Sequence, residues 1–173
     1  GIKEIRGKAY ATLRTVPCGG GRHPFETYLF VNHVEGLPQG LYHYLPMGHK
    51  LEFLGEESDL HKISVSLCEQ DWAAKASVVF YWSIVPYRVE WRYGIFSHYK
   101  SMIDIGHVGE NLYLACTALG LGTCGIGAYD QTLCDTMFEL DGEDEFIIYT
   151  EPVGTVSEKD LQAEKDFYAF VKE

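Results

Sequence analysis

Two glycine-rich segments contain the residues best suited to hold a ligand. The first, PCGGGRHP, covers 17–24, and the second, GLGTCGIG, covers 120–127. Neither is a Walker A loop, because no Gly-Lys-Ser/Thr follows, and the second is no dinucleotide-binding fingerprint, because it follows an expected helix. Glycine lets backbone N–H groups approach a flat or anionic ligand closely. The segments therefore favour a large cofactor gripped by main chain, and the alternative is that they are connections only.

Cysteine and histidine offer the other candidate chemistry. Cys18 and His23 could act as nucleophile and base, but no third group that would orient the histidine is evident, which favours a thiol in place of a serine in a ligand loop. Cys124 is expected to be a small buried side chain rather than a redox thiol. The seven histidines show no metal-ligand spacing, so no metal site is expected. His107 and Asn111 lie one helical turn apart and are interpreted as structural residues or partner contacts.

The composition limits the partners. The 173-residue chain has a formal net charge of −11, which disfavours nucleic acid and anionic membrane surfaces. Its longest apolar run, 78–86, is too short to span a bilayer. The five cysteines are an odd number without a CxxC pair, which argues against a disulfide framework and fits free thiols in a reducing compartment. We therefore expect a cytoplasmic protein.

The hydrophobic pattern predicts a sheet. Runs of β-branched and aromatic residues predict strands at 26–32, 77–85 and 145–154, and a hairpin that joins 41–45 to 50–54. The run at 77–85 is apolar on both alternations, which predicts a strand buried on both faces.

Helical spacing predicts four helices, at 58–69, 99–119, 131–138 and 157–171. In the longest, Gly106 and Gly109 permit close approach of another helix, and Gly120 is the expected residue that ends it. Asp130 and Ser157 are the expected caps of the last two helices. Helices and strands alternate without a strict βαβ repeat, which predicts an α+β fold.

Two segments give no regular prediction. Residues 86–98 are expected to form an irregular loop rich in aromatic side chains, and residues 1–16 mix charged, small and apolar side chains without a clear period.

Several motifs resemble those of the nitroreductase superfamily of flavoproteins. PCGGGRHPFETYLFV resembles that superfamily's Pro-Ser-Gly/Ala-Gly loop and the strand after it, and MIDIGHVGENLYLACTALGLGTCGIGAYD resembles its long central helix and flavin loop. GLYHYLPMGHKLEFL, together with WRYGIFSHYKSMIDIGHVGENLYLA, is most similar to the branch called SagB-type or McbC-type dehydrogenases.

The resemblance implies a mainly antiparallel central sheet flanked by helices, with a long central helix at a homodimer interface and FMN held by both chains. It implies that one flavin wall consists of Pro17, Cys18, Gly19, Gly20 and Arg22. It implies that the other wall consists of Gly122, Thr123, Cys124, Gly125 and Ile126. Oxidising members of the branch are associated with a lysine and a tyrosine near Tyr99 and Lys100, which become the catalytic candidates.

The implied function is an FMN-dependent oxidoreductase that transfers hydride between NADH, NADPH or an organic donor and a small organic acceptor. Two alternatives stay open: a flavin-free, catalytically idle dimer of the same fold, and an azoline-type peptide dehydrogenase. The chain departs from the family pattern at Cys18, where serine is usual, and in lacking the family's Arg-Arg-Ser-x-Arg segment, which binds the flavin phosphate. We therefore expect residues 1–173 to form a single nitroreductase-like domain without that segment. Its remaining candidate phosphate partners are Arg22, Arg88, Arg92 and Lys100.

Overall fold

The computed structural model describes residues 2–171, and its centre is a six-stranded sheet. The strand order is β5–β4–β3–β6–β8–β7, and every neighbouring pair is antiparallel. The six strands are β3 (Phe25–Val31), β4 (Gly40–Leu45), β5 (Lys50–Gly55), β6 (Val78–Ile84), β7 (Leu121–Thr123) and β8 (Phe146–Thr155). The predicted antiparallel sheet with flanking helices is confirmed.

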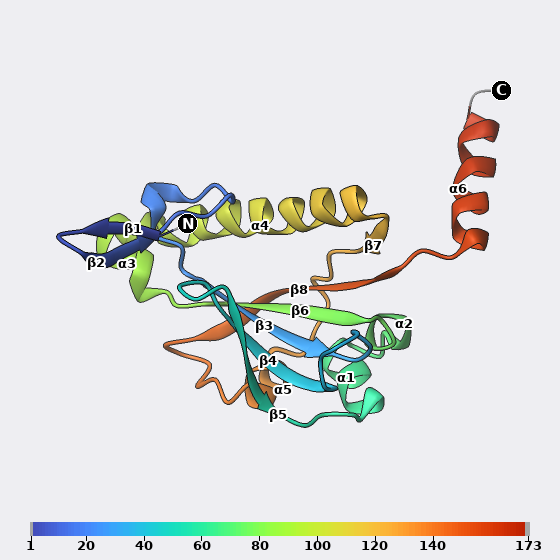
Figure 1. Cartoon of the computed structure of the whole chain (residues 1–173), viewed down its shortest axis with the longest axis horizontal. Coiled ribbons are helices and arrows are strands. Elements are labelled where there is room, and N and C mark those ends of the chain that lie inside the picture. The colour runs from blue at the N-terminus through green and yellow to red at the C-terminus, as the bar shows by residue number, and fades with distance from the viewer. Residues whose placement is uncertain (1, 172–173) are drawn as a thin grey trace.

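Helices cover the two faces of this sheet (Figure 1). The helices are α1 (Leu60–Ser66), α2 (Asp71–Ala74), α3 (Tyr87–Tyr93), α4 (Ser97–Leu119), α5 (Gln131–Met137) and α6 (Glu158–Val171), with 3-10 turns η1 (Gly19–Gly21) and η2 (Gly94–Phe96). Helix α4 runs along one face, α1, α2 and α5 lie against the other, and α6 stands apart at the end of β8.

The central strand β6 shows why the sheet is buried on both faces. Val79 and Tyr81 pack into the apolar cluster with α1, α2 and α5, whereas Phe80 and Trp82 belong to the cluster under α4. Successive side chains of a strand point to opposite faces, so a run that is apolar at every position needs two covering layers.

The predicted helix boundaries hold where capping residues are present. The carboxylate of Asp130 accepts the N–H of Leu133 at 2.9 Å, and the hydroxyl of Ser157 accepts the N–H of Asp160 at 3.1 Å. Gly120 follows α4 with φ of +69°, the left-handed geometry that favours glycine at this position.

Three sequence expectations differ from the structure, and a segment without a prediction, residues 2–12, has regular structure. Residues 86–98 are not an irregular loop, because α3 and η2 fill most of this range; α3 buries only Val89, so it has no apolar stripe to reveal it. Residues 2–12 form a hairpin of β1 (Ile2–Ile5) and β2 (Lys8–Thr12), with positive φ at Arg6 and Gly7. The expected helix at 58–69 ends after residue 66, and the second glycine segment contains the short strand β7.

The two glycines of α4 have different surroundings from those expected. A Cβ on Gly109 would lie 2.5 Å from Oε1 of Glu151 and 2.9 Å from Cε1 of Tyr149, so Gly109 packs on β8 of its own chain. A Cβ on Gly106 would meet nothing within 4 Å. The expectation that both glycines serve a neighbouring helix is therefore wrong for Gly109.

Candidate functional site

The first glycine loop is fastened to α4 through one carboxylate. Oδ2 of Asp104 accepts the N–H of Gly19 at 2.9 Å and the thiol of Cys18 at 3.2 Å. Gly20 has φ of +62°, and a Cβ there would overlap the phenol oxygen of Tyr93. The loop therefore needs glycine both for its backbone angles and for its contact with α3.

The thiol of Cys18 is arranged as a structural group. Burial, together with the neighbouring Asp104, raises its pKa, although the backbone N–H of His23 donates to Sγ at 3.0 Å and opposes the rise. Burial, followed by the charge of Arg14, lowers the pKa of the His23 imidazole. The contact from His23 comes from its backbone, so no general base is in place, and the nucleophile–base interpretation gains no support.

Two cationic side chains, Arg22 and Lys100, lie at or near the first glycine loop. Arg22 donates from Nε to the carbonyl of Gly20 at 3.0 Å, and its guanidinium lies 5.2 Å from the ring centre of Trp91. Nζ of Lys100 lies 5.0 Å from the ring centre of Tyr93, which places it beside the loop, whereas Tyr99 is 67% exposed. Two of the expected anion partners are thus next to the loop.

Arg88 is less available as a phosphate partner than its position suggested. Its Nη1 pairs with Oε1 of Glu26 at 2.5 Å, and Nε2 of His43 lies 3.2 Å from the other oxygen of that carboxylate. The glutamate of the first motif therefore ties β3 to α3 and β4.

The second glycine loop is fastened along β8. Thr123 pairs with Val153 and donates its hydroxyl to the carbonyl of Pro152 at 2.9 Å. Two residues past Cys124, the N–H of Ile126 donates to the carbonyl of Thr150 at 2.8 Å. The side chain of Ile126 is buried in the core with α1 and α5, so it could offer a ligand only its backbone. Cys124 is exposed, and the expectation of a buried small side chain there is wrong.

Gly125 is held between two phenols. Its N–H donates to the hydroxyl oxygen of Tyr113 at 2.8 Å, and a Cβ at this position would overlap the phenol oxygen of Tyr149. A valine at 125 would therefore disturb the packing of the chain itself. Such a variant would not separate ligand binding from folding.

A buried acid lies behind this loop. Glu151 is 0% exposed; Oε2 accepts a long hydrogen bond from Thr123 at 3.5 Å, and Oε1 has no hydrogen-bond partner in the part of the chain that the structure describes. Burial raises the pKa of this carboxyl to about 7, while Tyr149 and Thr123 oppose the rise. Sequence reasoning missed Glu151, and its only signal was a single charge inside the apolar strand FIIYTEPVGT.

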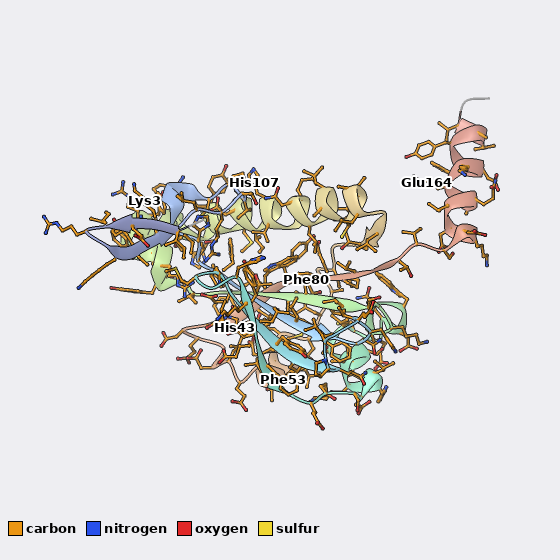
Figure 2. All side chains as sticks on the ribbon, viewed as in Figure 1. Lys3, His43, Phe53, Phe80, His107 and Glu164 are labelled. Atoms are coloured by element: carbon orange, nitrogen blue, oxygen red, sulfur yellow. The ribbon has the colours of Figure 1, made fainter. Side chains whose placement is uncertain are left out.

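The two glycine loops line different clefts. Pro17 and Cys18 border a cleft of about 650 Å³ between the first hairpin, the β4–β5 turn and α4, whereas Gly122, Thr123 and Cys124 border one of about 440 Å³ beside α2. Within residues 2–171, no hydrogen bond joins one loop to the other. Figure 2 shows Phe80 on the side of the sheet that faces α4 and His107 on the side of α4 away from the sheet. A single chain thus presents the two predicted walls in two separate places.

The antiparallel six-stranded sheet, the long helix α4 and the helices on the other face define an α+β fold. The model of the Nitroreductase family matches residues 2–155, and the chain belongs to this family. It is 32% identical over 129 residues to "Putative nitroreductase MJ1384" of Methanocaldococcus jannaschii, an alignment that covers 75% of this chain and 63% of that protein. The chain therefore spans less than two thirds of that relative's length.

Two solved structures share the fold. The Escherichia coli microcin synthetase McbBCD complex with truncated pro-MccB17 bound is similar with a TM-score of 0.73 and 19% identity, over 84% of this chain and 57% of that chain. A putative nitroreductase of Desulfovibrio desulfuricans in complex with FMN is similar with a TM-score of 0.59 and 14% identity, over 83% of this chain and 68% of that chain.

In residues 2–171, no helix has both the length and the apolar character needed to cross a membrane.

Proposed function

We propose that this chain is an FMN-dependent oxidoreductase that works as a homodimer, with the flavin between the Cys18 loop of one copy and the Gly125 loop of the other. The observation that carries the proposal is that the two glycine loops of one chain border separate clefts. Both loops are bonded to α4, the first through Asp104 and the second through Tyr113. A second copy related by a two-fold axis would bring unlike loops together, because each protomer offers both.

Helix α4 has large apolar side chains in solvent that a partner chain would cover. They are Met102, Ile103, Leu114 and Leu119. Exposed apolar side chains commonly mark a protein interface when they form a patch. Gly106 lies open on α4 and would let another helix approach closely.

The residues present fit a flavin. Both glycine loops border open clefts, and Arg22 and Lys100 supply positive charge near the first loop, where a flavin phosphate needs it. Bound FMN would supply hydride transfer between a nicotinamide or organic donor and a small organic acceptor. The chain's part is to orient the ring with backbone N–H groups and to exclude water.

The groups that would transfer protons to or from a substrate lie near the first glycine loop. We keep Lys100 and Tyr99 as the catalytic candidates. The ammonium of Lys100 lies over the ring of Tyr93, whose hydroxyl packs against Gly20, and would hold a proton for an acceptor bound at this loop. Tyr99 would have to meet the ligand or the second copy from its exposed position.

The first experiment is an absorbance spectrum of the purified protein after addition of FMN, combined with light scattering. We expect a dimer with one flavin per chain, bleached anaerobically by NADH or NADPH. A colourless dimer at saturating FMN would instead support the flavin-free alternative, and a monomer at micromolar concentration would refute the two-chain site.

A mixed dimer tests which chains build each site. Gly21→Trp blocks the first loop at an open position, and Cys124→Trp blocks the second at an exposed one; Gly21→Ala and Cys124→Ala are the matched controls. Each tryptophan homodimer should bind no FMN. The heterodimer of the two variants should bind one FMN per dimer, because one site collects both blocked loops and the other has neither. A heterodimer without FMN would show that both loops of a site come from one chain.

A further inference from the structure

The cleft of about 650 Å³ beside the first glycine loop has a built polar end. Its volume lies within the usual range of small-molecule sites, roughly 300–1,000 Å³. Its apolar surface includes Phe25, Trp82 and Val108, and the ring of Trp82 stacks at 5.7 Å on Phe80 and at 5.8 Å on Tyr149. The cleft therefore offers a fixed aromatic floor.

Arg14 occupies the polar end. It is half-buried, and its Nε donates to the hydroxyl of Thr12 at 3.1 Å. Within residues 2–171, no carboxylate pairs with its guanidinium within 4 Å. Burial lowers the pKa of Arg14, which shows that its positive charge is poorly solvated.

In the part of the chain that the structure describes, Arg14 has no carboxylate of its own. The acid whose charge acts on it is Glu26, and that carboxylate is already paired with Arg88 and His43. The other acid beside the first loop, Asp104, accepts hydrogen bonds from Gly19 and Cys18. His23 also lines the cleft, and its lowered pKa favours a neutral ring that can hydrogen-bond a ligand. An arginine fork that is partly removed from water is the usual receptor for a carboxylate or a phosphate.

We propose that this cleft binds a planar aromatic compound that carries a carboxylate or phosphate, with the anionic group on Arg14 and the ring against Trp82. Because Pro17 and Cys18 of the first glycine loop line this cleft, such a compound would be the acceptor substrate of the flavin enzyme. This assignment rests on the proposed function, whereas the binding itself does not.

Calorimetric titration tests the binding with probes that differ in charge. Benzoate and phenyl phosphate should bind, and benzamide, which has nearly the shape of benzoate but no charge, should bind at least tenfold more weakly. Arg14→Gln should weaken benzoate binding at least tenfold and leave benzamide unchanged, and Arg14→Lys, which keeps the charge and loses the fork, should fall between. Arg6→Gln is the matched control, because Arg6 is exposed at the turn of the first hairpin and does not line the cleft. Equal thermal unfolding of the variants shows that the fold is kept.

Parallel titrations with FMN and riboflavin identify the source of the anion. If Arg14→Gln weakens FMN but not riboflavin, and benzoate does not bind the parent protein, the anion is the phosphate of the flavin and the proposal is overturned. Equal benzoate affinity in the parent and in Arg14→Gln also overturns it. Arg14-dependent benzoate binding by a protein that takes up no FMN would support the cleft site and refute the flavin function, so the two failures are distinguishable.

Discussion

Replacing Glu151 with glutamine should change how the stability of the protein depends on pH. The difference in unfolding free energy between Glu151→Gln and the parent should shift in favour of glutamine as the pH rises. Glu151 is 0% exposed and its Oε1 lacks a partner among the described residues. In residues 2–171, no lysine, arginine or histidine pairs with it within 4 Å. An unpaired buried carboxylate is costly, so the fold favours the neutral acid.

The size of the effect follows from the two pKa values. Burial raises the pKa of Glu151 from 4.5 to about 7 in the folded chain. Below pH 4.5 the folded and the unfolded chain both hold the proton, and the carboxyl does not reduce stability. Between pH 4.5 and 7 only the unfolded chain releases the proton, so the unfolding free energy falls as the pH rises. Above pH 7 the loss is complete. The full loss is about 3 kcal/mol, of which about 2.5 kcal/mol develops between pH 5 and pH 8.5. Glutamine does not titrate and escapes this loss.

Urea unfolding at pH 5 and pH 8.5, at one fixed protein concentration, measures the effect. The difference in unfolding free energy between Glu151→Gln and the parent should move by about 2.5 kcal/mol in favour of glutamine from the lower to the higher pH. Glu110→Gln is the matched control, because Glu110 is exposed on α4 near the same carboxyl and should show little change. If the difference for Glu151→Gln moved by less than about 0.5 kcal/mol, the description of Glu151 as an unpaired buried acid would be refuted.

Three other contacts can be tested one at a time by substitution and urea unfolding. Gly109→Ala should destabilise by roughly 1–3 kcal/mol, because its Cβ would press on Glu151; unchanged stability would contradict the packing of Gly109 on β8. Asp104→Ala should cost about 1–3 kcal/mol and speed hydrogen exchange at the amide of Gly19, and unchanged exchange would show that this carboxylate does not fasten the loop. Asp130→Ala should cost about 1 kcal/mol while Asp130→Asn keeps most of the stability, unless the α5 cap makes no contribution.

The types and order of most elements were predictable from the sequence because their signals are local. Apolar residues on both alternations predicted β6, and Asp130, Ser157 and Gly120 marked helix ends through contacts within a few residues. The first hairpin and α3 were not predictable, because β1 and β2 are largely exposed and α3 buries only Val89, so neither carries an apolar period.

The candidate site likewise has a part that was predictable from the sequence and a part that only the tertiary structure revealed. Glycine content alone located both loops, since a side chain is sterically excluded at Gly20 and Gly125. The tertiary structure alone revealed what the loops rest on: Asp104 lies 86 residues from Cys18 in sequence, and Glu151 lies 28 residues from Thr123. Likewise, the unpaired charge of Arg14 is apparent only once Glu26 is seen to be shared by Arg88 and His43. Burial and pairing between residues distant in sequence are set by the packing of the whole chain, and no local pattern encodes them.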